Sequence, residues 1–294
     1  MPEEAQGNIY DLGYRGYEGP RLGRGHAIFT LYKSSLRSAF GLGRGFGAKF
    51  FPMGLTVLAF FPAVIQLAIA ALAEGVVDLF EAASYYGYTQ VILAIFCAAV
   101  APELVGRDQR TNTLTLYFSR AFQRLDYAAA KYAALATALL ALTLAPQVLL
   151  FIGNGFAGED LPGYIRDEWT QVAPIVVSAV LLCAYIGGIS LAIAAQTPRR
   201  AYSTVAILAA FMVTWIIGDI LAHTVERAIA LPFVLLAPFH VMRGFTLYLF
   251  GEDPGTNSGL AQLDVHGAIY LVTAIAFAAV TAALLYRRYR ELAA

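Results

Sequence analysis

The chain has 294 residues, of which 59% are hydrophobic and only 14% are charged, and its mean hydropathy of +0.63 excludes an ordinary soluble domain. Its 20 basic and 20 acidic residues give a formal net charge of zero, and no nucleic-acid partner is expected. Apolar stretches of about 20 residues, the length that a helix needs to cross a bilayer, recur along the chain. We therefore predict an all-α, polytopic membrane bundle with the lipid bilayer as its surroundings.

The first 49 residues precede the first apolar span and are expected to form a cytoplasmic arm. Between Arg24 and Gly45, apolar residues recur at three- and four-residue steps, whereas Lys33 and Arg37 fall on other faces. This spacing predicts a basic amphipathic helix on the inner membrane surface, although a solvated arm would explain the same charges. The glycine-rich stretch Gly41–Lys49 does not fit a phosphate-binding loop, and we interpret it as a flexible joint before the first span.

Six apolar stretches between residues 50 and 286 form the predicted membrane domain. Because lipid offers no hydrogen-bond partners to the backbone, each stretch is expected to be a helix. The six spans are Phe50–Leu72, Gln90–Gly106, Ala133–Phe151, Ala173–Ala195, Tyr202–Ala222 and Ala268–Tyr286.

The basic residues predict the orientation of these spans. Seventeen of the 20 Lys and Arg residues lie before the first span, between spans two and three, between spans four and five, or after span six. The other three connections carry three arginines and eleven acidic residues. Because Lys and Arg accumulate on the cytoplasmic side, both termini, including the tail 287–294, are expected in the cytoplasm of a plasma-membrane protein.

The stretch Ala228–Phe250 is long enough for a seventh span, but it contains Pro232, Pro238 and Arg243. An arginine at the centre of a span costs about 2.5–3.5 kcal/mol on insertion scales. We therefore predict that the outer segment 223–266 forms a broken, re-entrant hairpin before the last span.

The sequence contains no catalytic, metal-binding or cofactor-binding motif. The four histidines are scattered, and Cys97 and Cys183 lie in apolar runs, as expected of small buried side chains. The chain is therefore not expected to be an enzyme, and a membrane-embedded enzyme is the least favoured alternative.

A few polar residues inside the spans are candidates for a transport pathway. Asp219 lies near the outer end of span five, where it could also reach interfacial water or pair with Arg227 or Arg243. The sparse polar positions of the other spans, in an otherwise apolar lining, indicate an apolar or amphipathic cargo. The candidate pathway residues are Gln66, Gln90, Gln147 and Asp219.

The connection 103–131 carries eight formal charges in 29 residues. Glu103, Arg107, Arg110 and Leu114 have helical spacing and would share one face of a helix that continues span two. The following threonines can cap a new short helix. Its apolar residues Leu114, Tyr117 and Phe118 would form a small projecting edge, which we call the apolar knob. Such a loop suits docking to a cytoplasmic partner, but an inside loop that only obeys charge rules has the same pattern. The candidate loop residues are Glu103, Arg107, Asp108, Arg110, Asn112, Thr113, Leu114, Tyr117, Phe118, Arg120, Arg124 and Lys131.

This loop resembles the one between spans two and three of type-2 ABC exporter permeases. Glu103 resembles the acid that ends span two in that family, and Thr113–Leu114 resembles its Thr-Leu pair. Leu116–Ser119 is similar to the hydrophobic stretch that ends in serine, Arg124 to the later arginine, and Lys131 to the lysine that opens span three. Asn112, Ala121 and Ala130 depart from the pattern, because glycine, proline and glycine are usual there.

The resemblance implies a function. In that family the loop is a coupling helix on a separate ATPase subunit, and two permeases work with two ATPase subunits that hold ATP and Mg²⁺. A non-transporting membrane module that anchors or regulates a cytoplasmic partner through the same loop is the main alternative.

Overall fold

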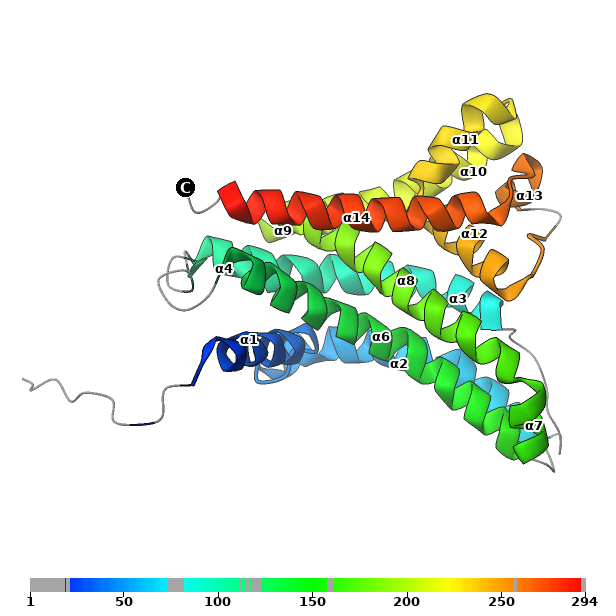
Figure 1. The fold of residues 1–294 in the computed structure, drawn as a ribbon, viewed down its shortest axis with the longest axis horizontal. Coiled ribbons are helices and arrows are strands. Elements are labelled where there is room, and N and C mark those ends of the chain that lie inside the picture. The colour runs from blue at the N-terminus through cyan, green and yellow to red at the C-terminus, as the bar shows by residue number, and fades with distance from the viewer. Residues whose placement is uncertain are drawn as a thin grey trace, which may run out of the picture.

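The computed structural model describes residues 22–72, 82–111, 123–157, 161–255 and 258–291, together with Gly19, Thr113, Leu114 and Tyr117. Regular structure in these ranges is helical and no strand occurs in them, which confirms the all-α prediction. The long helices run side by side in one bundle (Figure 1).

Six helices of the described ranges are long and apolar enough to cross a membrane, which indicates a multi-pass membrane protein and agrees with the six predicted spans. A bent helix pair, described below, is the candidate for a seventh. All six begin before the predicted spans. The extension is longest in the second and third, where buried aromatic residues such as Tyr86 and Tyr127 continue the packed helix beyond the apolar stretch. The spans are α2 (Phe46–Leu72), α3 (Ala82–Ala101) with its continuation to Arg110, α6 (Arg124–Ala157), α8 (Trp169–Ala194), α9 (Arg200–Leu208) with η2 (Ala209–Val213) and α10 (Thr214–Thr224), and α14 (Gly267–Glu291).

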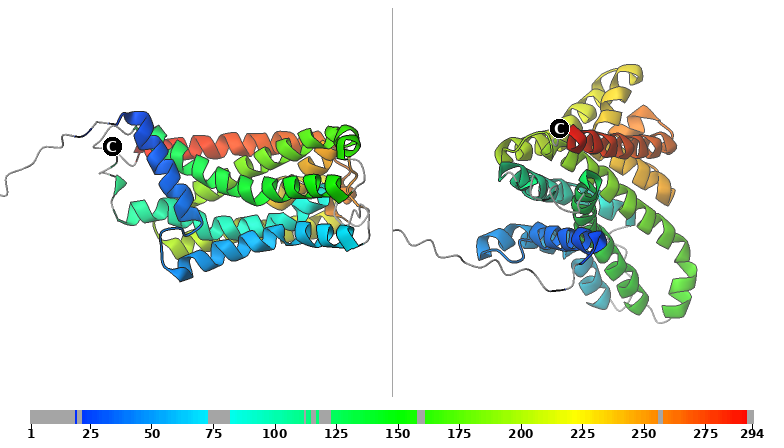
Figure 2. Two further views of the ribbon diagram at one scale, coloured as in Figure 1. Left: turned by 90° about the horizontal axis from the view of Figure 1, so that it is seen from below. Right: turned by 60° about the vertical axis from the view of Figure 1, so that its left-hand side comes forward.

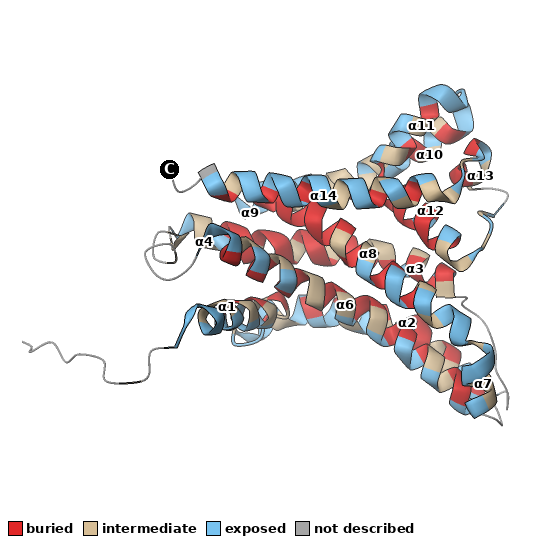
Figure 3. Ribbon diagram, viewed as in Figure 1, coloured by how far each residue is buried: buried red, intermediate tan, exposed pale blue. Residues whose placement is uncertain are grey.

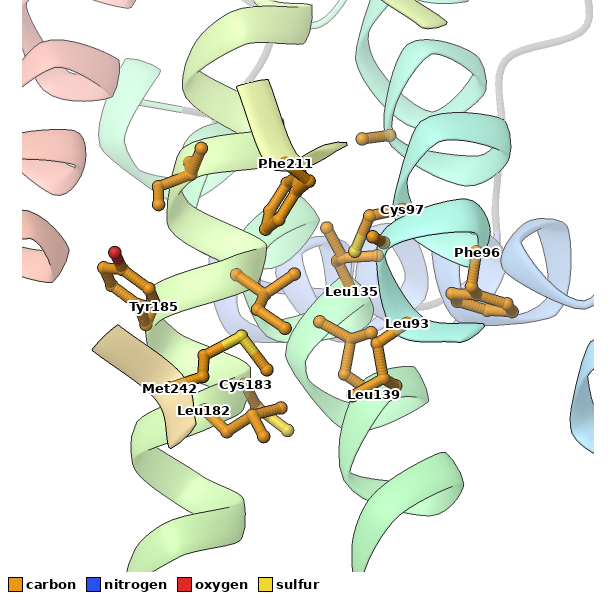
Figure 4. Packing of buried hydrophobic residues seen from close by; sticks show 14 of the residues in the cluster. Leu93, Phe96, Cys97, Leu135, Leu139, Leu182, Cys183, Tyr185, Phe211 and Met242 are labelled. Carbon is orange, nitrogen blue, oxygen red and sulfur yellow. The ribbon is translucent and has the colours of Figure 1, made fainter. Parts of the chain in front are cut away.

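Helices α3 and α8 form the centre of the bundle. In each of them 72% of the most apolar stretch is buried, against 22% in the α9–α10 span and in α14 (Figure 3). The core between them contains Leu93, Leu139 and Leu182, together with the free cysteines Cys97 and Cys183 (Figure 4). Both cysteines are buried, as predicted.

Glycine allows α8 and α14 to approach each other closely. A Cβ atom on Gly188 would lie 2.5 Å from the Thr281 hydroxyl oxygen of α14. The absence of a side chain at Gly188 therefore permits the close packing of these two helices.

Helix α1 (Arg24–Ala39) is present where an amphipathic helix was predicted. It packs against α6 and crosses the end of the bundle (left view of Figure 2), and the Tyr32 hydroxyl donates to Thr137 Oγ1 at 3.0 Å. Its residues Leu31 and Ala39 are buried in the protein, whereas Phe29 is exposed. The apolar face thus serves the bundle itself, and contact of α1 with the membrane surface stays a prediction.

The glycine-rich joint after α1 is a hydrogen-bonded turn. Gly41 has a φ of +67°, its N–H donates to Ser38, and the Leu42 N–H donates to Arg37, which is the Schellman pattern of a helix end. A Cβ atom at Gly41 would lie 2.2 Å from the Ala48 carbonyl oxygen. Only glycine fits this turn, which fixes the direction in which the chain enters α2.

The predicted break in Ala228–Phe250 is present. Helix α11 (Arg227–Leu236) and helix α12 (Pro238–Phe250) meet at 94°, with Ala237 extended between them. The proline after Ala237 disfavours helical backbone at that residue, which explains the position of the bend. The short helices α7 (Leu161–Asp167) and α13 (Gly259–Leu263) lie at the same end of the bundle as the end of α12 (Figure 1). We call this end the acidic end, and the end with α1 and the last turns of α14 the basic end.

Cysteine labelling in intact cells tests the topology of the bent pair. In a variant without Cys97 and Cys183, single cysteines at the exposed positions Ala228 and Asp253 should both react with an impermeant maleimide from outside. The expected reason is that the bend at Ala237 returns the chain to the surface it left.

Two reference positions accompany this measurement. Ser84 should be labelled from outside, and Thr197 only after the membrane is permeabilised, because most basic residues share its side. Labelling of Ala228 and Asp253 from opposite sides would establish a seventh span instead.

Candidate functional site

The predicted loop begins as a direct continuation of α3. A π-helical turn, η1 (Pro102–Gly106), joins α3 to the short helix α4 (Arg107–Arg110) without a break. Proline lacks the N–H that an α-helix requires, and a wider turn accommodates the missing bond. Glu103 lies in this turn, at the basic end of the bundle.

The Glu103 carboxylate is the common partner of four arginines, which we call the Glu103 cluster. Arg44 Nη1 donates to Glu103 Oε1 at 2.7 Å. Arg200 Nη1 lies 3.6 Å from Oε2, and guanidinium nitrogens of Arg107 and Arg110 lie 3.9 and 4.0 Å from the carboxylate. The predicted alignment is therefore present for Glu103, Arg107 and Arg110, but α4 ends at Arg110, so it does not extend to Leu114. The cluster also contains two arginines from the α1–α2 turn and from the start of α9.

The Glu103 cluster has three more positive charges than negative ones. The side chain of Glu103 is only 16% exposed, whereas those of Arg107 and Arg200 are 54% and 56% exposed. The largely buried carboxylate thus holds the guanidinium groups together on the protein side, and their solvent-exposed parts form a basic surface. Such a surface favours an acidic partner and attracts it before contact.

A second ion pair closes the base of the loop. Lys131 Nζ of α6 lies 2.8 Å from Asp108 Oδ2 of α4, and the Tyr127 hydroxyl donates to the same oxygen at 2.8 Å. The Lys131 and Asp108 side chains are 8% and 15% exposed. Because the charges are mostly buried, the pair fixes the two ends of the loop relative to each other.

The loop residues between these ends pack partly on the protein itself. Leu114 and Tyr117 are half-buried against the core, and the Tyr117 ring lies 5.8 Å from that of Tyr127. Burial, together with the nearby Asp108 carboxylate, raises the pKa of the Tyr117 phenol. The predicted apolar knob is therefore less exposed at Leu114 and Tyr117 than the sequence suggested. The predicted loop residues Asn112, Phe118 and Arg120 lie outside the described residues.

The threonines after α4 hydrogen-bond to its last turn. Thr111 Oγ1 donates to the Arg107 carbonyl oxygen at 3.0 Å, and Thr113 Oγ1 donates to that of Asp108 at 3.2 Å. The Tyr117 N–H donates to the Thr113 carbonyl, as in one turn of helix. The threonines thus connect the end of α4 to the turn that follows.

The loop base is also joined to α8 and α14. Gln109 Nε2 and Arg288 Nε both donate to the Ala195 carbonyl oxygen at the end of α8, at 3.2 and 3.1 Å. Arg124 Nη1 donates to the Arg290 carbonyl oxygen at 2.8 Å. A displacement of the loop would therefore be transmitted to four of the spans.

The first turn of α6 is bound to α1. The Arg24 guanidinium donates to both carboxylate oxygens of Asp126, at 2.7 and 2.8 Å, and to the Gln123 side-chain oxygen. The hydrogen bonds to Asp126 raise the pKa of Arg24, which is charged in any case. Helix α1 is thereby fixed to the end of the loop.

The candidate pathway residues do not form one site. Gln66 and Gln147 line the same cavity at the acidic end. Gln90 lies beside Arg243 in a separate, very small cavity. Asp219 lies at the acidic end against α13, and its partner in an ion pair among the described residues is His223, at 3.9 Å, rather than an arginine.

Several residues of the loop base and of the acidic end could not be identified from the sequence. Arg44, Arg200 and Arg24 were counted only as positive charges, because their partners lie far away in the sequence. Asn154 was missed because it lies beyond the predicted end of span three, although a polar residue next to an apolar stretch is a signal that could have identified it.

The described residues contain no group of three or more His, Cys, Asp or Glu side chains that could hold a metal ion. No family model matches the chain, and no curated protein matches it.

The buried pair can be tested by a double-mutant cycle. Lys131→Met leaves the Asp108 carboxylate buried without its cation and should lower the free energy of unfolding by about 3–5 kcal/mol. Combining it with Asp108→Asn should restore most of this loss, since no buried charge then remains. The measurement is unfolding of the purified protein in detergent.

The Arg24–Asp126 pair, in which the arginine is half-exposed, is the control. Arg24→Gln should lower stability less than Lys131→Met, because Arg24 is half-exposed and screened by solvent. Equal losses in the single Lys131→Met variant and in the double variant would show that Asp108 and Lys131 do not act as a pair.

Proposed function

We propose that this chain is the membrane subunit of an ATP-driven exporter of the type-2 ABC class. It would work with a second permease, identical or related, and with two ATPase subunits that bind ATP and Mg²⁺. The basic end would face the cytoplasm of a cell with the chain in its plasma membrane. The cargo would be apolar or amphipathic, in keeping with the apolar spans.

The observation that carries this proposal is the way in which loop 103–131 is held. The Glu103 cluster fixes its first turn, and the Asp108–Lys131 pair closes its base. Hydrogen bonds to the carbonyl oxygens of Ala195 and Arg290 join it to α8 and α14. When a partner displaces a loop attached in this way, the loop can transmit the displacement to the spans, as coupling requires.

The mechanism follows from these attachments. Closure of the two ATPase subunits would displace both copies of the loop, and the attached helices would move with it as rigid bodies. Because α3 and α8 are central, their movement would change the packing of the whole bundle. Two arrangements of the spans would alternately expose the cargo to the two sides of the membrane.

One observation favours the alternative of a non-transporting anchor. Leu114 and Tyr117 rest partly on the core of the protein, so less apolar surface faces a partner than a strong docking knob would offer. A membrane module that holds a cytoplasmic protein through charge alone would need no more than the exposed arginines.

Co-purification tests the proposal. The tagged chain, expressed in its native membranes, should recover an ATPase subunit with a nucleotide-binding motif, identified by mass spectrometry and by ATP hydrolysis. Arg107→Ala combined with Arg110→Ala should reduce the recovered ATPase about tenfold, and the reduction should shrink as salt is raised, because exposed charges are screened. Leu114→Ala with Phe118→Ala should cost about 2 kcal/mol or more of docking energy if these residues are anchors.

A control with the same change of charge lies at the opposite end of the bundle. Arg166→Ala combined with Arg227→Ala should leave recovery of the ATPase unchanged, because both side chains are exposed at the acidic end. Recovery of a partner without ATPase activity would favour the anchor. Recovery of the ATPase equally by both double variants would show that the loop is an ordinary connection.

A further inference from the structure

A cavity of about 330 Å³ lies at the acidic end of the bundle, between α2, α6, α7 and α8. This is the end with α7 in Figure 1, opposite α1 and α4. Its volume is within the range of small-molecule sites. The polar side chains that line it are Gln66, Gln147, Asn154, Tyr164, Glu168, Gln171 and Glu252.

Three of these polar side chains are buried in the membrane helices. Gln66, Gln147 and Asn154 are 1%, 2% and 7% exposed, although the most hydrophobic stretches of α2 and α6 are strongly apolar. Burying such groups is costly unless they are hydrogen-bonded or used. Gln147 Nε2 donates to the Ala82 carbonyl oxygen at 2.9 Å, which leaves its amide oriented by α3.

Asn154 Oδ1 is buried and has no hydrogen-bond partner. An acceptor of this kind requires an N–H or O–H donor, and its loss of hydration costs about 1–3 kcal/mol when none is present. Because Asn154 lines the cavity, a molecule in the cavity can supply that donor.

The charges around the cavity are negative. Glu168 and Glu252, from the start of α8 and the end of α12, both line it, and no lysine or arginine is among the described residues of its lining. Arg166 of the neighbouring helix α7 is exposed and does not line the cavity. The three connections at this end carry eleven acidic residues against three arginines in the sequence, so the local potential attracts cations.

The remaining lining favours an organic cation over a metal ion. Phe151 and Tyr164 lie with their ring centroids 5.5 Å apart, and aromatic faces attract alkylammonium groups. The part of the chain that the structure describes contains no group of three His, Cys, Asp or Glu side chains suited to a metal ion. Amide oxygens, two carboxylates and aromatic rings together are the surroundings that an ammonium group prefers.

We propose that this cavity binds a small organic ammonium compound that also carries one O–H or N–H donor. The carboxylates of Glu168 and Glu252 balance its charge, the aromatic rings contact its alkyl groups, and Asn154 Oδ1 accepts its hydrogen bond. The site lies within one copy of the chain, and its binding does not depend on an ATPase partner or on the proposed transport.

A set of three probes separates the two features of the ligand. Choline has both the charge and the hydroxyl group, its neutral carbon isostere has only the hydroxyl group, and tetramethylammonium has only the charge. Isothermal titration of the purified full chain in nanodiscs should show choline binding most tightly, tetramethylammonium more weakly, and no binding of the neutral isostere. Equal heats for choline and the neutral isostere, or no binding of either cation, would overturn the proposal.

Two variants and a control locate the binding. Glu168→Gln keeps the shape of the side chain and should weaken choline binding about tenfold, whereas Glu226→Gln, which removes an exposed acid outside the cavity, should leave it unchanged. Asn154→Leu should remove the preference for choline over tetramethylammonium. Its thermal midpoint should not fall, because the replaced oxygen has no partner.

These outcomes remain decisive if one variant fails to fold. If Asn154→Leu lowers the thermal midpoint strongly, Glu168→Gln and Glu252→Gln still test the site through the charge. Equal choline affinity in Glu168→Gln, Glu252→Gln and Glu226→Gln would show that the cation binds elsewhere. Because the isolated chain is used, loss of choline binding and loss of the ATPase partner are independent results.

Discussion

One carboxylate holds the basic end of this protein together. Among the described residues, the Glu103 carboxylate pairs with four guanidinium groups, which come from the α1–α2 turn, from α4 and from the start of α9. Without it these groups would repel one another at the end of an apolar bundle, where few other acids are near. The direction of α4, the first turn of loop 103–131 and the position of the α1–α2 turn depend on this attraction, whereas the Arg24–Asp126 pair fixes α1 to α6 and the Asp108–Lys131 pair closes the base of the loop. The turn at Gly41 contributes to this arrangement, because it brings Arg44 to the Glu103 carboxylate.

The two ends of the bundle differ in charge, and each difference has a structural consequence. At the basic end, Glu103, Asp108 and Asp126 are each largely buried and pair with basic side chains, and the surplus of positive charge forms an exposed surface on a loop attached to α6, α8 and α14. At the acidic end, two carboxylates line a cavity with buried amides. The spans between the two ends can be long and contain few polar side chains, because the polar contacts are concentrated where water is near.

The sequence predicted the features that depend on local composition. The six spans follow from apolar length, and the break at Ala237 follows from the proline after it. Glu103, Arg107 and Arg110 could be grouped because their spacing is helical. Arg44 could not be joined to Glu103, since 59 residues separate them and seven basic residues precede the first span. The partner of a charge depends on the packing of helices, which periodicity does not encode.

The same limit explains the two less successful predictions. Leu114 and Tyr117 have the spacing of a projecting apolar edge, but the ring of Tyr127 lies within reach and covers Tyr117. Gln66 and Gln147 were recognised as polar points, yet only the packing of α2 on α6 places both in one cavity with Asn154. Sequence identified these residues, and the structure decides which of them act together.

Hydrogen–deuterium exchange on a Glu103→Gln variant in nanodiscs tests the central role of this carboxylate most directly. The substitution keeps the size of the side chain and removes its charge, so the four arginines lose their common partner. Exchange should increase in the α1–α2 turn (residues 40–48) and at the start of α9 (residues 199–203), which are distant in sequence, and should not change there in Asp167→Asn, an exposed acid at the other end. If Glu103→Gln leaves exchange in both segments as it is in the wild type, the Glu103 cluster does not hold the basic end together.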